Sequence, residues 1–147
     1  MKILFIGTTG VHHSLVAAHW LVHNDLPDKL TQIAGFADNT EDHKGLPILV
    51  GHDNRNNEVY SLGAGRDVLM AKKTIEELLG VLGFYPHDLL IKPIQVRGDR
   101  LFPFINKVCS VGAEQGMRRM MARYLSSGPV DSIISQVEGF REHYQLH

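Results

Sequence analysis

The sequence predicts a single α/β domain over residues 1–147, with three layers, a mixed sheet, an edge β-hairpin and a helical C-terminal tail. The first observation behind this prediction is an apolar run, residues 2–6, followed at once by a glycine–threonine loop and a helix-like segment. The second is a pair of strand-like runs around a turn rich in asparagine and aspartate. The third is the helical character of the C-terminal third of the chain.

The sequence of the first part of the chain predicts a strand followed by a buried helix. Residues 2–6 are continuously apolar, as in a strand that is covered on both faces, and we expect this strand at the centre of the sheet. Residues 14–23 form a helix whose apolar side chains cover most of its circumference, so the helix should be buried. The polar cluster at residues 39–45 is interpreted as an exposed loop.

The middle of the chain predicts a hairpin, a helix and a further strand. The runs 47–52 and 58–63 flank the turn and should form the edge hairpin. A helix is expected over about residues 67–80, and a strand ending near Pro93 follows. The tail should contain helical pieces around residues 101–109, 113–125 and 130–144, with Pro129 in the first turn of the last.

Composition excludes several classes of protein. Of the 147 residues, 44% are hydrophobic and 21% charged, which is typical of a globular domain with a substantial core. The net charge of −1 gives no basis for binding nucleic acid or an anionic membrane. Cys109 is the only cysteine, so no internal disulfide is possible, and we interpret it as a buried structural residue. No apolar run is long enough to span a membrane, and we expect a cytoplasmic protein.

The loop from Gly7 to Ser14 is the main candidate site. A strand–loop–helix junction directs backbone N–H groups and the positive end of the helix dipole at one place, which favours an anion such as phosphate. The candidate ligand-binding residues of this loop are Thr8, Thr9, Gly10 and Ser14. The loop lacks the lysine of the phosphate-binding Gly-x4-Gly-Lys-Ser/Thr motif, since His13 precedes Ser14. The alternative interpretation is a tight turn with Ser14 as the helix N-cap.

His12 and His13 are the candidate catalytic residues, as general acid, general base or phosphate acceptor. A shift of one residue in the start of the helix exchanges their positions, so the sequence leaves open which one faces the site. Candidate orienting carboxylates are Asp38, Asp42 and Asp53. A metal site formed by His12, His19 and His23 is a weaker hypothesis, because the His-Glu-x-x-His pattern is absent, and we assign no residue as a metal ligand.

Two later segments each contain an arginine that is a further candidate for the site at residues 7–14. Arg66 lies in the glycine-containing stretch 63–67 before a helix, and Arg97 follows the later strand. Ligands of open α/β sheets bind outside the carboxyl ends of the strands, where these loops should converge with residues 7–14. A simple glycine turn with Asp67 at the helix start is the alternative for the first segment.

A third group of arginines has a different interpretation. Arg118, Arg119 and Arg123 share a helix with several methionines. We interpret the arginines as a solvated face rather than a nucleic-acid interface, and the methionines as core or oligomer contacts.

Several motifs resemble an uncharacterised bacterial protein family, domain of unknown function 3189. The resemblance covers most of the chain and rests on Gly10-Val11-His12-His13-Ser14, Val16-Ala17-Ala18, Leu26-Pro27 and residues 57–63. Members of the family often carry a cysteine or polar residue where Gly7 stands and a second serine where His13 stands, so this chain does not support a cysteine nucleophile. The resemblance supports the fold and the importance of the loop, and it names no reaction.

These observations predict a protein that binds a phosphorylated small molecule or nucleotide at residues 7–14. If the protein is an enzyme, phosphoryl transfer or phosphoester hydrolysis fits the residues best. The alternative is a non-catalytic regulatory or interaction protein, which could form homo-oligomers and whose helical tail would form the partner surface. The sequence identifies no cofactor, and we expect neither a membrane nor nucleic acid as a partner.

Overall fold

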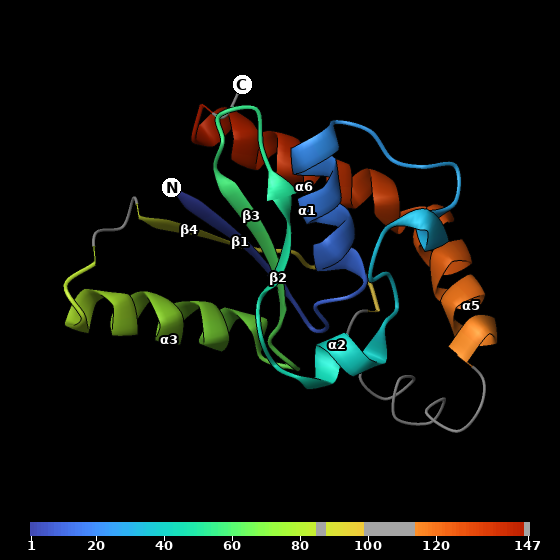
Figure 1. The fold of residues 1–147 in the computed structure, drawn as a ribbon, viewed down its shortest axis with the longest axis horizontal. Coiled ribbons are helices and arrows are strands. Elements are labelled where there is room, and N and C mark those ends of the chain that lie inside the picture. The colour runs from blue at the N-terminus through green and yellow to red at the C-terminus, as the bar shows by residue number, and fades with distance from the viewer. Residues whose placement is uncertain (85–87, 99–113, 146–147) are drawn as a thin grey trace.

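The computed structural model describes residues 1–84, 88–98 and 114–145. Its described strands form a four-stranded mixed sheet in the order β2-β3-β1-β4 (Figure 1). Strand β1 pairs in parallel with both β3 and β4, whereas β2 is antiparallel to β3 at the edge of the sheet. The strands are β1 (Lys2–Gly7), β2 (Ile48–His52), β3 (Glu58–Gly63) and β4 (Leu89–Pro93).

The helices cover both faces of this sheet. They are α1 (His13–His23), α2 (Asn39–His43), α3 (Val68–Val81), α5 (Glu114–Ser126) and α6 (Pro129–His143), with a short 3-10 helix η1 (Leu30–Gln32). Helix α1 packs against β1, β2 and β3 and is covered in turn by α6, while α3 packs on the other side against β1 and β4 (Figure 1). The predicted three-layer α/β arrangement with a mixed sheet and an edge hairpin is confirmed.

Strand β1 contributes to a core on each face of the sheet. Ile3 and Phe5 belong to the larger core, on the α1 and α6 side, and the ring of Phe5 meets the ring of Phe140 edge-on at 5.7 Å. Leu4 and Ile6 belong to the smaller core below α3. Successive side chains of a strand point to opposite faces, so a strand buried on both faces requires a continuous apolar run.

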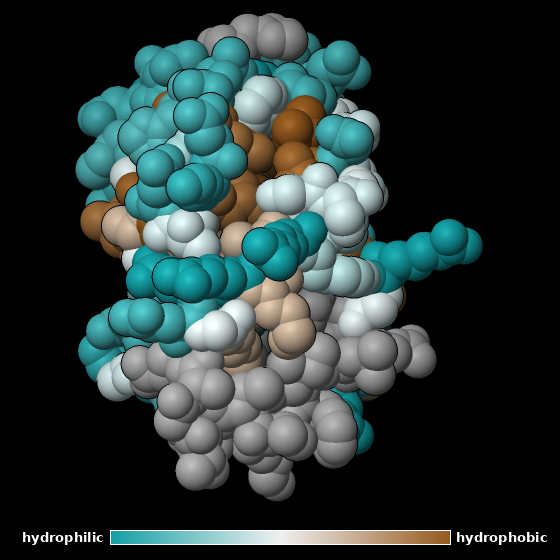
Figure 2. All heavy atoms as spheres, turned by 90° about the vertical axis from the view of Figure 1, so that its right-hand side faces the viewer, coloured by the Kyte–Doolittle hydropathy of each residue, from teal (hydrophilic) through white to brown (hydrophobic). Residues whose placement is uncertain are grey.

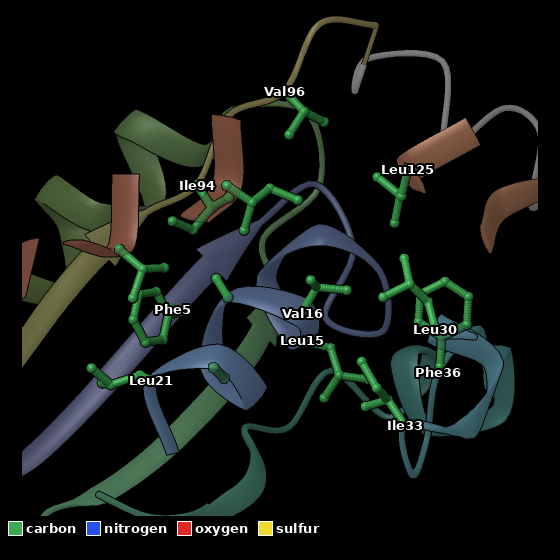
Figure 3. Close-up of a cluster of buried hydrophobic side chains, with 14 of the residues drawn as sticks. Phe5, Leu15, Val16, Leu21, Leu30, Ile33, Phe36, Ile94, Val96 and Leu125 are labelled. Atoms are coloured by element: carbon green, nitrogen blue, oxygen red, sulfur yellow. The ribbon is translucent and has the colours of Figure 1, made fainter. Parts of the chain in front are cut away.

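A further group of apolar side chains extends the larger core toward α5. Leu30, Ile33 and Phe36 come from the segment between α1 and α2, and all three are buried. Figure 3 shows these three side chains beside α1. Phe36 and Ile33 lie on one side of Leu30, and Leu125 of α5 lies on the other side. This packing joins α5 and the 30–36 segment to the central layer.

The predicted elements agree with the structure to within one or two residues, with one exception. Residues 39–45 were expected to be an exposed loop, but residues 39–43 form α2. Asp38 is the N-cap of this helix, because its carboxylate accepts hydrogen bonds from the N–H groups of Thr40 and Glu41. The predicted piece 101–109, with Cys109, lies outside the described residues.

Helix α3 is the least buried of the long helices. Val68 is its only fully buried residue among those described, and Ile75 and Leu79 pack against the smaller core. Large apolar side chains on its other sides are more than half exposed, namely Leu69, Met70, Leu78, Val81 and Leu82. The helix therefore presents an apolar surface to solvent.

Candidate functional site

The loops after β1 and β3 meet at the carboxyl edge of the sheet. The N–H group of Ala64 donates to the carbonyl oxygen of Gly7 at 2.8 Å, and that of Gly65 donates to the carbonyl oxygen of Thr8 at 3.2 Å. From here the chain enters α1 on one face and α3 on the other, although β1 and β3 are neighbours. Strand ends whose connections leave on opposite faces open a crevice, the usual place for a ligand in this class of fold.

Buried hydroxyl groups fix the shape of the first loop. Ser14 donates to the carbonyl oxygen of Thr9 at 2.7 Å, and Ser61 of β3 donates to that of Gly10 at 2.7 Å. The hydroxyl oxygens of Ser14 and Ser61 lie 2.9 Å apart. Ser14 is inside α1 rather than at its N-cap, since the helix begins at His13. Its hydroxyl group therefore holds the loop against the sheet.

Asp42 of α2 binds the same loop from the other side. One oxygen of its carboxylate accepts a hydrogen bond from the N–H group of Gly10 at 2.7 Å. A Cβ atom at Gly63 would lie 2.5 Å from that oxygen, so glycine is needed there for the carboxylate to fit. Burial raises the pKa of Asp42, while the hydrogen bond from Gly10 acts in the opposite direction. The N–H group of Gly10 is thus already hydrogen-bonded to a carboxylate of the protein itself.

His12 and His13 are completely buried. The Nδ1 atom of His12 is hydrogen-bonded to the hydroxyl group of Thr9 at 2.6 Å, and its ring meets the ring of Phe36 edge-on. Burial lowers the pKa of His12 to about 4. Burial, together with the neighbouring His12, lowers the pKa of His13 to about 3, although a backbone hydrogen bond with Ile94 opposes this. Both rings are therefore neutral at pH 7 and supply no positive charge to a phosphate.

A pocket of about 190 Å³ lies at this edge of the sheet, beside the start of α3. Its described lining comes from three segments: Thr8 after β1, the stretch 66–69 at the start of α3, and Gln95 and Val96 after β4. The segments after β1, β3 and β4 thus meet at one pocket, but the last of them contributes Gln95 and Val96 to the described lining and not the predicted Arg97. Asp67 is the N-cap of α3, since its carboxylate accepts from the N–H group of Met70 at 3.1 Å.

The predicted site residues separate into two groups. Thr8 and Arg66 line the pocket together. Thr9, Gly10 and Ser14 use their polar groups in the internal hydrogen bonds described above. Arg97 is exposed beyond Val96, and its carbonyl oxygen accepts a hydrogen bond from the hydroxyl group of Tyr124. A catalytic role for His12 or His13 stays a prediction.

The histidines proposed as metal ligands are not gathered into a site. His19 and His23 of α1 stack with ring centroids 4.3 Å apart. Among residues 1–84, 88–98 and 114–145, no group of three or more histidine, cysteine, aspartate or glutamate side chains is placed to hold a metal ion. The same part of the chain holds no helix with the length and apolar character that crossing a bilayer requires.

Sequence reasoning did not single out Gln95 or Ser61. Gln95 lines the pocket because the parallel strand β4 ends beside β1. The order of strands in the sheet cannot be deduced from the local sequence pattern, so this position could not be predicted. Ser61 did carry a signal, because it is a small polar residue two positions after Val59 in an alternating strand and so shares the buried face of Val59. A buried hydroxyl in such a place needs a hydrogen-bond partner, and here it has two.

Fold and site together define a three-layer α/β protein with a small polar pocket at the carboxyl edge of its parallel strands. The model of the family described as "Protein of unknown function (DUF3189)" matches residues 2–125, and the chain belongs to this family. Neither a curated protein nor a solved structure shows significant similarity to the chain.

Proposed function

We propose that this protein binds a phosphorylated small molecule in the pocket between Thr8, the start of α3 and Gln95. The observation that carries the proposal is the combination of Arg66 with the N-terminus of a fourteen-residue helix in one cavity. The N–H groups of Val68 and Leu69 belong to the first helical turn, so no carbonyl group of the helix accepts from them. The positive end of the helix dipole and the Arg66 guanidinium both favour a phosphate group there.

The other lining residues suit the remainder of such a ligand. Thr8 and Gln95 offer hydrogen-bonding groups. Asp67 uses one carboxylate oxygen for its helix cap, and the second can accept from a ligand hydroxyl group. The pocket volume of about 190 Å³ is below the roughly 300–1,000 Å³ of cavities that enclose a drug-sized ligand. It therefore fits a phosphate group and a small polar part, with the rest of the ligand outside.

Binding is tested by calorimetric titration of the purified chain with inorganic phosphate, sugar phosphates and nucleotides. Arg66→Gln removes the guanidinium and should weaken binding about tenfold or more, the effect of losing one charge-assisted hydrogen bond. Arg55→Gln is the matched control, because Arg55 is exposed in the hairpin turn, away from the pocket lining. Equal affinities of the Arg66→Gln variant and the native chain would contradict the proposal.

Phosphoryl transfer or phosphoester hydrolysis is the reaction we propose for this pocket if the bound ligand is turned over. His12 or His13 would then serve as the acid–base group, which requires the loop 7–14 to open, since both rings are buried. Release of phosphate from the ligands identified by titration is the measurement. Loss of turnover in His12→Gln or in His13→Gln, with binding retained, supports the reaction; full turnover in both variants contradicts it.

Self-association through α3 is a second candidate function. The observation in its favour is the exposed apolar surface of α3, on which Met70, Leu78 and Val81 share one side of the helix. Lys73 and Glu77 border that side, and in an antiparallel pair of α3 helices each would face its opposite charge on the second copy. Light scattering should then give the mass of a dimer, and Leu78→Glu should give a monomer. A monomeric native chain would contradict this candidate.

A further inference from the structure

A groove lies between the 28–31 segment and α5. Its volume is about 590 Å³, three times that of the pocket at the carboxyl edge of the sheet, and the two cavities share no described lining residue. Figure 2 faces the side of the molecule that carries α5, where hydrophilic side chains border a recessed strip of hydrophobic ones. One wall of the groove contains Lys29 and Thr31, and the other contains Arg119 and Arg123.

The two walls are held together by described contacts. The guanidinium group of Arg118 donates to the carbonyl oxygen of Thr31 at 3.0 Å, which ties α5 to the segment containing η1. Below the groove, buried Leu30 packs in the same core as Met121 and Leu125 of α5. The groove is therefore part of the packed fold, with walls from segments about ninety residues apart in the sequence.

The groove concentrates positive charge that the fold does not use. The ion pairs among the described residues do not include Lys29, Arg119 or Arg123, all of which are exposed. With Asp28 as the only acidic residue of the described lining, three cations and one carboxylate give the groove a charge of +2. The whole chain has a net charge of −1. Three cationic side chains that line one groove give it a positive potential, which attracts an anion.

The chemistry of the walls indicates which anion fits. Arg119 and Arg123 are four residues apart on α5, so their side chains are neighbours on one face of the helix. A guanidinium group binds two oxygens of a phosphate or carboxylate group in its own plane. Lys29 adds a third cation from the opposite wall, while Leu30 and Ala122 supply apolar surface between the two.

We propose that this groove binds a small molecule with two or more neighbouring anionic groups, phosphate or carboxylate, at a site separate from the sheet-edge pocket. The two arginines bind one anionic group and Lys29 binds the next. Thr31 offers a hydroxyl group from the same wall as Lys29, and Asp28 accepts a hydrogen bond from a donor on the ligand.

The test is calorimetric titration of the whole chain with tripolyphosphate in one arm and citrate in the other, at low and at high salt. Binding in the groove should weaken about tenfold or more in Arg119→Gln and in Arg123→Gln, because each loses charge-assisted hydrogen bonds. It should also weaken as the salt concentration rises. The tighter of the two probes identifies whether the groove prefers phosphate or carboxylate groups.

Two control variants separate the groove from other sites. Arg55→Gln makes the same change of charge in the hairpin turn and should bind both probes with native affinity. Arg66→Gln alters the sheet-edge pocket and should leave the groove unaffected, so this proposal and the proposed function can fail independently. Unchanged affinity in both α5 variants, binding lost only in Arg66→Gln, or no binding of either probe would overturn the proposal.

Discussion

Gly7 ends β1 directly beside the buried ring of His13. A Cβ atom at this position would lie 2.4 Å from the Nε2 atom of His13, closer than packed atoms approach. Because that ring is fully buried, it has no room to move aside. Gly7→Ala should therefore lower the free energy of unfolding by about 1–3 kcal/mol, as overpacked core positions do.

Urea denaturation measures this change, and Gly139→Ala provides the matched control. Gly139 is exposed inside α6, and a Cβ atom there would contact nothing within 4 Å. The same chemical change should stabilise the protein by about 0.5–1 kcal/mol, because alanine favours a helix interior over glycine. Two variants of equal stability would contradict the packing described at Gly7.

Asp42 offers a second prediction at the scale of a residue. Asp42→Ala leaves the N–H group of Gly10 without its acceptor and should cost about 1–3 kcal/mol of unfolding free energy. Asp42→Asn keeps an acceptor oxygen but loses the charge, so its cost should be smaller. Urea denaturation of both variants gives the comparison. If Asp42→Asn were as destabilising as Asp42→Ala, the hydrogen bond from Gly10 would not be the source of the stability.

At the scale of elements, local pattern predicted most of the fold. The buried strand, the apolar helix after it and the hairpin each carry their own signal: a continuous apolar run, helical spacing, and turn residues that tolerate positive φ. Asn56 of the hairpin turn does have a φ of 61°. Pro129 begins α6 as expected, since its missing N–H group is not needed in a first turn.

Helix α2 shows where local pattern fails. Five residues are too few for a helix to form by propensity alone, so α2 depends on its Asp38 cap and on the contact of Asp42 with a loop 32 residues away. The polar sequence of residues 39–45 gives no sign of that distant contact. For the same reason the sequence singled out the loop 7–14 but not which of its residues line the pocket.

The caps of α2 and α3 give a prediction at this scale. Asp38→Ala removes the acceptor of two N–H groups, and Asp67→Ala removes the acceptor of one. Each should lower the free energy of unfolding by about 0.5–2 kcal/mol. Asp67→Asn and Asp38→Asn should retain most of the native stability, because asparagine is an equally good cap. Denaturation midpoints that were the same for the alanine variants and the native chain would contradict these cap assignments.

For the whole molecule, the order of strands in space decides where the site lies. The chain passes from β1 to the edge strand β2, returns through β3 beside β1, and then crosses past β1 to β4. This path brings residues 8, 66 and 95 to one pocket. The sequence supports a convergence of loops, because ligands of open α/β sheets bind outside the carboxyl ends of the strands. The strand order that brings Gln95 to the pocket follows from tertiary packing alone.

The two buried histidines make the stability of the whole molecule depend on pH. Their pKa values in the folded state are about 4 for His12 and about 3 for His13, below the value near 6.5 of an unfolded chain. The unfolded chain therefore binds more protons below pH 6.5. The stability from the neutral rings is complete above that pH and is lost as the pH falls toward 4 and then 3.

Each histidine should contribute a slope of about 1.4 kcal/mol per pH unit between roughly pH 6 and its folded pKa, so the pair approaches about 2.7. Urea denaturation at pH 7, 6 and 5 measures the slope, and comparison with variants removes the contribution of the carboxyl groups. His12→Gln and His13→Gln should each reduce the slope by about half, because each variant removes one of the two buried rings. A slope that is the same in the native chain and in both variants would mean that the fold does not hold the rings of His12 and His13 neutral.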